Sequence, residues 1–438
     1  MRWKADTYRG WGRALAGSGT LARPERVALL ADIAKEETAP AIGNRRSYGD
    51  ACIVSDGRAI DMTRLDRILE FDADTGMVHT EAGCQIGDLL RAFAPRGWLP
   101  PVMPGTGFAT VGGAIAMDVH GKNHHHAGSF GQHVHEITLM TPDGPLVITK
   151  DDNRSLFKAT IGGLGQTGPI LSARFKLLKA KGDVMIVTER RVSDWNSFIR
   201  LLDASDATYS VGWIDATARG LHLGRGILEE AETGAGLIKS RKSSRKVPFN
   251  APGFALSAPV VRAFNGLYWR RIPEAGRTVV KTIEDFFFPL DKLQDWNKLY
   301  GKTGFLQFQA VVPPDQVEAL KTMLVKIANS GLASPLAVLK RMGSGRGGYM
   351  SFPMRGYTLA VDFRNTKGAR QLLAELEVET QKIGGRVYLA KDATMAAETV
   401  KSMYPERQEW VREVQSVDPE GAYTTDLVRR LKLRADDA

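Results

Sequence analysis

A glycine-rich run followed by histidines, residues 104–126, is the feature that most restricts what this chain can fold into. Four of the nine residues from Gly105 to Gly113 are glycines, so the backbone there can approach a flat or anionic group. A short apolar stretch then leads to His120, Lys122 and Asn123, which can exchange protons or form hydrogen bonds. The pattern predicts either a cofactor cradle with reactive groups at its rim, or a tight turn into a buried strand followed by solvated histidines.

The size and composition of the chain are those of a globular protein. Its 438 residues are enough for two domains, or for one large core with a second lobe, and 43% are hydrophobic. The apolar runs are far shorter than the roughly 18 residues that suggest a membrane span. The N-terminus lacks the apolar segment of a secretory signal, and two cysteines cannot form a disulfide framework. We therefore expect a cytoplasmic protein that is at most peripheral to a membrane.

A net charge of +10 favours an anionic partner, which could be a phosphate-bearing cofactor or substrate, a membrane surface or a nucleic acid. Nucleic acid is disfavoured because the basic residues are dispersed and no base-reading motif is evident. The densest cluster, residues 239–246, has five basic residues in eight. We expect it to be an exposed loop, either contacting an anionic membrane surface or having no partner.

The first 180 residues show short strands with a few helices, which indicates an α+β arrangement and no βαβ repeat. Turn signals at residues 72–76 and 141–144 predict hairpins. The predicted helices are residues 24–37 and 86–93, and the predicted strands include 41–42, 59–62, 78–82, 137–140 and 146–148.

Residues 163–168 match the pattern G-x-G-x-x-G, but they do not predict a Rossmann fold. That fingerprint needs a strand before it and a helix after it. Here residues 169–177 alternate like a strand.

From about residue 182 the pattern changes to longer strands and amphipathic helices. The strand predicted over residues 305–312 places Gln307 and Gln309 on one face. A last strand over 384–392 ends near Lys391, which the sequence alone gives no reason to call catalytic. The other predicted strands are 184–192, 209–215 and 357–363, and the predicted helices are 195–202, 315–330 and 367–383.

Six of the eight histidines lie between His120 and His135, which raises the question of a metal. Three of them are adjacent and cannot all face one ion, and no cysteine is near, so no metal site is predicted. The chain also lacks the motifs of serine esterases and P-loop nucleotidases. The place of His120 directly after the glycine run favours a functional role over a structural one.

Several of these motifs together resemble a known family. The runs 43–50, 104–131 and 162–168 and the C-terminal run Tyr388–Asp392 resemble the flavin oxidoreductases of the vanillyl-alcohol-oxidase type, which have a PCMH-type FAD-binding domain. The resemblance extends almost end to end. It is strongest to the branch that oxidises a polyprenylphosphoryl pentose for cell-wall arabinan biosynthesis, because the block His120–His125 is fairly specific to that branch.

The resemblance implies an FAD-binding domain over residues 1–181, a substrate domain over 182–385, and a C-terminal segment, 386–438, that returns to the FAD domain. It also implies non-covalent FAD, because Arg46 stands where covalent members have a flavin-linked histidine. The cofactor-binding residues implied are Gly43, Arg46, Ser47, Tyr48, Gly49, Asp50, Gly105, Thr110, Val111, Gly112, Gly113, Met117, Asp118, His120, Ile170 and Tyr388.

The implied reaction oxidises the 2′-hydroxyl of a polyprenylphosphoryl-β-D-ribose to the 2′-keto sugar, by hydride transfer to flavin N5, with a short-chain reductase as a partner. Such a step needs a base for the hydroxyl proton and donors for the developing oxyanion. The implied catalytic residues are His120, Lys391, Tyr48 and Lys122, and the implied substrate residues are Gln307, Gln309, Lys340 and Asp362.

Two residues differ from those of that branch. Ala360 stands where the branch has a cysteine, and Thr358 stands where it has an asparagine. The alternatives left open are a soluble sugar-alcohol or aldonolactone oxidase on the same scaffold, and a non-enzymatic protein that binds lipid or nucleic acid through the basic loop.

Overall fold

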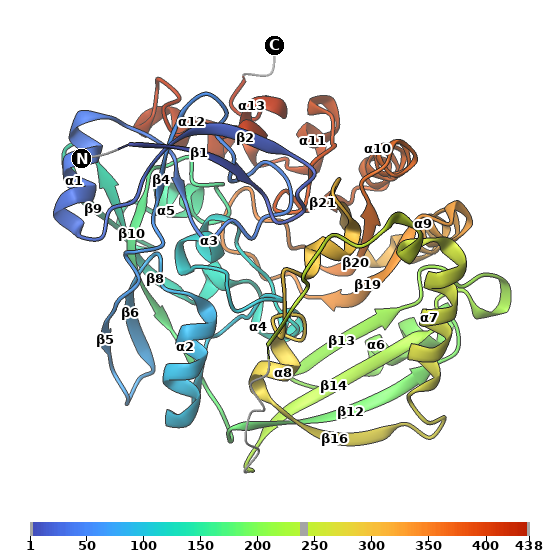
Figure 1. The fold of residues 1–438 in the computed structure, drawn as a ribbon. Coiled ribbons are helices and arrows are strands. Elements are labelled where there is room, and N and C mark those ends of the chain that lie inside the picture. The colour runs from blue at the N-terminus through green and yellow to red at the C-terminus, as the bar shows by residue number, and fades with distance from the viewer. Residues whose placement is uncertain (1–2, 237–243, 436–438) are drawn as a thin grey trace.

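The chain folds into two neighbouring parts, one containing two small sheets and the other a single eight-stranded sheet (Figure 1). The computed structural model describes residues 3–236 and 244–435. In Figure 1 the blue and teal N-terminal elements lie beside the green to orange strands of the large sheet, and the red C-terminal helices return to the N-terminal side. The predicted α+β class is confirmed.

The N-terminal part holds a four-stranded sheet of order β1-β2-β4-β3 and an antiparallel five-stranded sheet of order β5-β6-β10-β8-β9. The predicted turns at 72–76 and 141–144 join β5 to β6 and β8 to β9. Because β10 begins directly after the G-x-G-x-x-G run, the rejection of a Rossmann fold is confirmed. The strands are β1 (Lys4–Arg9), β2 (Ala16–Ala22), β3 (Ala41–Ile42), β4 (Arg58–Asp61), β5 (Ile68–Phe71), β6 (Met77–Glu81), β8 (Val134–Thr141), β9 (Gly144–Thr149) and β10 (Ile170–Lys176).

The glycine run does not lead into a strand, so that alternative is wrong. Thr110 Oγ1 accepts a hydrogen bond from the Gly113 amide at 3.2 Å and thereby caps a short helix, α3 (Val111–Ala116). Tertiary contacts outweigh the low helix propensity of the two glycines in this helix. The other helices of this part are α1 (Val27–Glu36), α2 (Ile86–Phe93), α4 (His124–Ala127) and α5 (Arg154–Thr160).

The large sheet is antiparallel throughout and has the order β16-β12-β14-β13-β19-β20-β18-β21. The strands predicted over 184–192, 209–215, 305–312 and 357–363 are confirmed to within one residue at each end. The sheet comprises β12 (Val184–Val192), β13 (Tyr209–Ile214), β14 (Gly226–Gly234), β16 (Arg277–Thr282), β18 (Phe305–Val312), β19 (Ala333–Met342), β20 (Gly356–Arg364) and β21 (Arg386–Val387).

The strand predicted over 384–392 is much shorter than expected, since β21 ends at Val387. The chain turns there, and the amides of Lys391 and Asp392 both donate to the Tyr388 carbonyl, at 2.9 and 3.1 Å. Lys391 therefore lies in a turn after the sheet.

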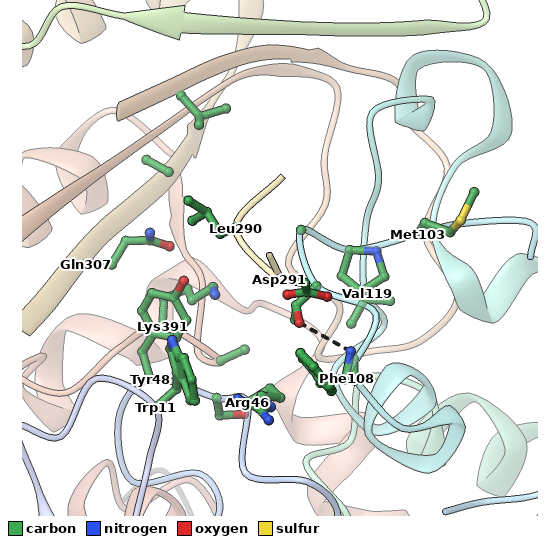
Figure 2. Close-up of a pocket in the computed structure, with 18 of the residues that line it drawn as sticks. Trp11, Arg46, Tyr48, Met103, Phe108, Val119, Leu290, Asp291, Gln307 and Lys391 are labelled. Atoms are coloured by element: carbon green, nitrogen blue, oxygen red, sulfur yellow. Dashed lines mark hydrogen bonds between the residues drawn. The ribbon is translucent and has the colours of Figure 1, made fainter. Parts of the chain in front are cut away.

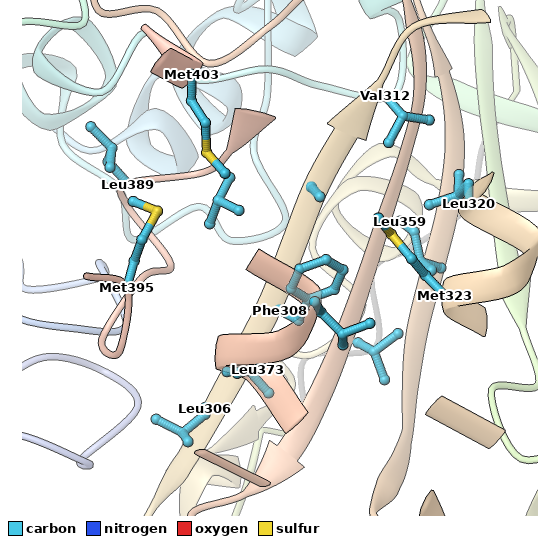
Figure 3. Packing of buried hydrophobic residues seen from close by; sticks show 14 of the residues in the cluster. Leu306, Phe308, Val312, Leu320, Met323, Leu359, Leu373, Leu389, Met395 and Met403 are labelled. Atoms are coloured by element: carbon cyan, nitrogen blue, oxygen red, sulfur yellow. The ribbon is translucent and has the colours of Figure 1, made fainter. Parts of the chain in front are cut away.

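One face of the large sheet packs on helices, while the other faces a cavity. Along β18, Leu306, Phe308 and Val312 enter the hydrophobic core, together with side chains from α9 (Val317–Ser330) and α10 (Lys367–Lys382) (Figure 3). Gln307 and Gln309, on the opposite face of β18, line the cavity. The predicted alternation is confirmed, and it separates core residues from cavity residues within one strand. The remaining helices of this part are α6 (Trp195–Ala204), α7 (Ala258–Arg270) and α8 (Ile283–Phe287).

The C-terminal helices are α11 (Ala397–Met403), α12 (Arg407–Val417) and α13 (Asp426–Arg430). Trp410 of α12 is fully buried, and α12 packs against α5 of the N-terminal part. At the end of α13, Arg430 bridges Asp50 and Asp392, each at 2.8 Å. The last segment of the chain thus packs on the N-terminal part and connects it to the turn that follows the large sheet.

Four short strands form two further pairs. Two-residue strands pair as β7 (Trp98–Leu99) with β11 (Leu178–Lys179), and as β15 (Arg245–Lys246) with β17 (Leu293–Gln294). Residues 239–243 of the predicted basic loop lie outside the described residues, so that prediction stays untested. Within the described ranges, no helix is long and apolar enough to cross a bilayer.

Candidate active site

A cavity of about 980 Å³ lies where the glycine-rich segment faces the large sheet. Its walls come from residues 41–52 and 103–122, from the inner faces of β13, β14, β18, β19 and β20, and from the segments 285–296 and 388–391 (Figure 2). The structure thus brings together segments that are more than 300 residues apart in the sequence.

The wall formed by residues 43–48 and 103–113 brings glycine backbone close to the cavity. A Cβ added to Gly43 would lie 2.4 Å from Thr110 Oγ1, so a side chain cannot be accommodated there. A Cβ on Gly105 would meet no atom within 4 Å, so its backbone faces open space. Both glycines and Gly113 line the cavity. This wall, the cradle, can present bare backbone to a ligand.

His120 is buried at the junction of the cradle and the sheet, with 8% of its surface exposed. Its Nε2 lies 3.0 Å from the Gln309 amide nitrogen, whereas its Nδ1 has no hydrogen-bond partner among the described residues. Burial, and secondarily the charge of Lys340, hold the pKa of His120 well below its ordinary value. The side chain is therefore a neutral imidazole with one nitrogen available to a ligand.

Four lysines from different segments line the cavity: Lys122, Lys281, Lys340 and Lys391. Lys281 forms ion pairs with Glu189 and Glu229. Lys122 Nζ donates to the Phe286 carbonyl and lies 3.9 Å from the centroid of that residue's ring. Burial lowers the pKa of Lys122 and of Lys340 to about 8. These amines favour an anionic ligand, because binding a negative charge would offset their loss of hydration.

Lys391 contacts a tyrosine ring and interacts electrostatically with Asp362. Its Nζ lies 3.3 Å from the centroid of the Tyr48 ring. Asp362 accepts hydrogen bonds from Gln307 and from the Tyr300 hydroxyl. Burial lowers the pKa of Lys391 and raises that of Asp362, so both move toward neutrality, while the attraction between the two charges opposes each shift. Such an amine can gain or lose a proton near neutral pH.

Arg46 is held between two aromatic rings at the rim of the cradle, and sequence analysis missed both rings (Figure 2). Its guanidinium carbon lies 4.3 Å from the centroid of the Trp11 ring and 4.6 Å from that of Phe108. Asp291, also missed, accepts a hydrogen bond from the Gly107 amide at 2.7 Å. Trp11 and Asp291 lie in loops far apart in the sequence, so only the folded structure shows that both lie beside the cradle.

Most of the residues implied by the family resemblance line this cavity, but six do not. Gly49 and Asp50 contact the C-terminal segment, and Val111, Gly112 and Ile170 pack in the N-terminal part. The residues that do line it are Gly43, Arg46, Ser47, Tyr48, Gly105, Thr110, Gly113, Met117, His120, Lys122, Gln307, Gln309, Lys340, Asp362, Tyr388 and Lys391.

Asp118, the sixth residue outside the lining, is fully buried and organises the loops behind the cradle. Its carboxylate accepts hydrogen bonds from the Ser129 hydroxyl and the Gly131 amide, both at 2.8 Å. It also accepts one from the Gly347 amide at 2.8 Å and one from the Ser351 hydroxyl at 2.5 Å. Asp118 thus joins the histidine-rich segment to residues 347–351 of the second part.

The histidine cluster makes mainly backbone contacts. His124 Nδ1 accepts from the Gly343 amide at 3.1 Å, and His125 Nε2 lies 2.9 Å from the Ala207 carbonyl oxygen. His133 Nε2 lies 2.9 Å from the Ala127 carbonyl oxygen. No group of three or more metal-ligating side chains occurs among the residues that the structure describes.

Comparisons with known proteins agree with this geometry. A family model described as an FAD binding domain matches residues 20–150. The decaprenylphosphoryl-beta-D-ribose oxidase of Mycolicibacterium smegmatis is 37% identical over 97% of this chain and 97% of that protein. An uncharacterized protein of Streptomyces coelicolor is 33% identical over 79% of this chain and 99% of that protein. The L-gulono-1,4-lactone dehydrogenase of Mycobacterium tuberculosis is 27% identical over only 35% of this chain and 37% of that protein. The chain is an FAD-linked oxidoreductase and belongs to the decaprenylphosphoryl-beta-D-ribose oxidase family.

Proposed function

We propose that the chain oxidises the 2′-hydroxyl of a polyprenylphosphoryl-β-D-ribose to the 2′-keto sugar, with FAD held in the cradle. The observation that carries the proposal is the position of Lys391, a half-buried amine with a lowered pKa that lines the same cavity as the cradle. The similarity to the mycobacterial oxidase over nearly the whole of both chains supports the choice of substrate.

The residues of the cradle fit a flavin dinucleotide. Gly105 leaves room for a flat ring or a pyrophosphate, and Gly43 lets its segment pack closely on Thr110. His120 Nδ1 is a buried polar atom without a hydrogen-bond partner among the described residues. Gly43, Gly105, Thr110, Gly113 and His120 would hold the group, and when bound it supplies the acceptor for a hydride. We further propose that FAD is held without a covalent bond, since Arg46 cannot form the link that a histidine makes.

Lys391 would accept the proton of the substrate hydroxyl. Its lowered pKa leaves part of the amine neutral near pH 7, and a base works best when its pKa lies near the working pH. The O–H proton would pass to Nζ while the carbon loses its hydride, and the resulting ammonium would lie beside Asp362. Tyr48, beneath the amine, would fix its position.

Lys122 and Lys340 would bind the phosphate of the substrate. Both amines line the cavity on the side of the large sheet, and burial weakens their hydration. Gln307 and Gln309, on the same face of β18, would hydrogen-bond the sugar hydroxyls.

The domain division 1–181, 182–385 and 386–438 forms part of the same proposal. It is supported by the two small sheets before residue 177 and by the start of the large sheet at Val184. The final strand, β21 (Arg386–Val387), still pairs with β18 of the large sheet, so the return toward α5 begins after Val387, slightly later than the proposed boundary.

The proposal is tested with purified protein under anaerobic conditions. A short-chain polyprenylphosphoryl-β-D-ribose should bleach the flavin absorbance and yield a product lighter by two hydrogens. Bleaching by L-gulono-1,4-lactone or a free sugar alcohol, but not by the lipid-linked ribose, would favour the aldonolactone or sugar-alcohol oxidase instead. A reductase partner would be sought by adding a short-chain reductase and NADH to the keto product.

A further inference from the structure

The floor of the cavity changes from polar to apolar across the large sheet. The strand register sets five lining residues in one row, on β18, β20, β19, β13 and β14: Gln309, Ala360, Val338, Trp213 and Ile227. Gln309 begins the row beside the cradle, where it contacts His120. The ring nitrogen of Trp213 donates to the Pro335 carbonyl at 2.8 Å, so no unpartnered polar side-chain atom follows Gln309 in this row.

Further apolar side chains enlarge this part of the cavity. Val211, two residues before Trp213, lines the cavity from the same face of β13. Phe286 and Phe287 of α8 line it too, and the ring centroids of Phe287 and of Tyr209 on β13 are 5.0 Å apart. Neighbouring strands are about 4.8 Å apart, so the surface from β19 to β14 is about 10 Å wide. We call its four residues the apolar floor: Val211, Trp213, Ile227 and Val338.

The charged lining residues around the apolar floor already have partners within the chain. They pair as Glu229 with Lys281 at 2.8 Å, Asp285 with Lys292 at 2.6 Å, Arg271 with the Tyr268 hydroxyl at 2.9 Å, and Lys122 with the Phe286 carbonyl. A charged ligand group would have to displace one of these partners, whereas a hydrocarbon chain would not. This part of the cavity therefore favours an apolar ligand group.

Two polar groups without partners lie at one border of the apolar floor, on β19 and β20. Lys340 is opposite Thr358 in the register, and both line the cavity. Among the residues that the structure describes, Lys340 makes no hydrogen bond or ion pair, and the buried Thr358 Oγ1 has no hydrogen-bond partner. Val211 of the floor lies beside Lys340, because Gly212 pairs with Leu339. An anionic group bound by Lys340 and Thr358 would thus adjoin the apolar floor.

We propose that the apolar floor holds the isoprene units next to the phosphate of the substrate, while Lys340 and Thr358 bind the phosphate itself. This inference rests on the proposed function, which supplies a phosphate that joins a sugar to a hydrocarbon tail. The order of groups along the substrate then follows the order of the strands: the sugar over β18 and β20, the phosphate at Lys340 of β19, and the hydrocarbon over β13 and β14. The tail is stabilised there because it leaves water for apolar surface.

The test is calorimetric titration of the FAD-loaded full chain with two monophosphates that differ in tail length, dimethylallyl phosphate and farnesyl phosphate. Wild-type protein should bind farnesyl phosphate about tenfold or more tightly, because its longer tail buries more apolar surface. Val211→Thr/Val338→Thr keeps the branched shape of both side chains but adds hydroxyl groups to the floor. This variant should bind dimethylallyl phosphate nearly as wild type does and should lose most of the preference for farnesyl phosphate.

The matched control is Val147→Thr/Val280→Thr, which makes the same change at exposed strand positions of β9 and β16 and should keep the preference. Circular dichroism and flavin content show that each variant is folded. Equal affinity of wild type for the two phosphates would overturn the proposal, as would an unchanged preference in Val211→Thr/Val338→Thr.

Anaerobic flavin reduction separates this inference from the proposed function. Ribosyl phosphates that carry the same two tails serve as substrates, each below saturation. A preference for farnesyl phosphate in binding, without bleaching by either substrate, would keep the apolar floor as a prenyl-phosphate site and refute the proposed oxidation. Equally fast bleaching by both substrates would support the oxidation and overturn the role of the floor.

Discussion

Replacing Lys391 by methionine tests the most specific part of the proposed mechanism. Methionine keeps the length and most of the volume of the side chain but removes the amine. The cradle contacts are made by other residues, so the variant should purify with its flavin. The reduction of that flavin by substrate should be much slower than in the wild-type enzyme.

The expected magnitude follows from what the amine contacts. The amine packs over Tyr48 in the protein without substrate, so losing that contact alone should affect stability more than the barrier. What the reaction loses is the proton acceptor, which typically contributes about 10²–10⁴ in rate, or about 3–5 kcal/mol. The burial that raises the pKa of Asp362 lets this carboxyl take a proton once its cation is gone, so folding should survive.

The assay is anaerobic stopped-flow reduction across the pH range from 5 to 9. If the neutral amine is the base, the wild-type rate rises with pH through the apparent pKa of the Lys391 and Asp362 pair. The negative charge of Asp362 raises the pKa of Lys391, so Asp362→Asn should move this inflection to lower pH. Lys391→Met should show no inflection in this range.

Lys321→Met is the matched control, because Lys321 is a surface lysine of α9 that pairs with Glu318 and should not affect the rate. A rate that falls as pH rises would mean that the ammonium form is needed, and it would refute the role of Lys391 as base. Reduction of Lys391→Met at the wild-type rate would refute any catalytic role.

Three further predictions concern the cofactor, the cavity and the join between the two parts. Acid precipitation should release all of the FAD into the supernatant, and colour that stays with the pellet would contradict non-covalent binding. Ala360 lines the cavity on β20, so Ala360→Cys should react with a maleimide, and the adduct should block reduction of the flavin by the substrate. The native Cys52 and Cys84 are buried with pKa values raised to about 12, so mass spectrometry should find no adduct on the wild type. Arg430→Met leaves Asp50 and Asp392 buried without their cation, which should lower the free energy of unfolding by about 3–5 kcal/mol in urea titrations. A change below 1 kcal/mol would show that the bridge is not needed for stability.

Features set by local sequence could be predicted, and the large sheet shows why. Along β18, apolar residues alternate with Gln307 and Gln309, and this period of two predicted both the strand and the face that the two glutamines share. The structure shows that this face lines the cavity. The turns at 72–76 and 141–144 could also be predicted from local sequence, because their residues favour turn conformations wherever they occur. The rejection of a Rossmann fold depended only on the strand pattern after Gly168.

Features set by contacts between distant segments could not be predicted. The glycines of α3 have low helix propensity, and only the Thr110 cap and the packing around the helix make it form. Trp11 and Phe108 enclose Arg46 because two loops meet in space, and no pattern in either loop signals this. The exposure of Val260, Phe264 and Leu267 on α7 was likewise hidden, because the sequence does not show which face of this helix meets the sheet.

Gly49 and Asp50 belong to the run that carries the family resemblance, yet they do not line the cavity. A Cβ on Gly49 would lie 1.7 Å from the Asp392 carbonyl oxygen, so only glycine allows the turn that carries Lys391 to approach. The Tyr48 amide donates to the Ala390 carbonyl at 2.9 Å, and Arg430 joins Asp50 to Asp392. The three-residue run Tyr48–Asp50 thus supplies the ring beneath the amine and fixes the turn that bears it. The position of Lys391 relative to the cradle is therefore set by contacts between the first fifty and the last fifty residues of the chain.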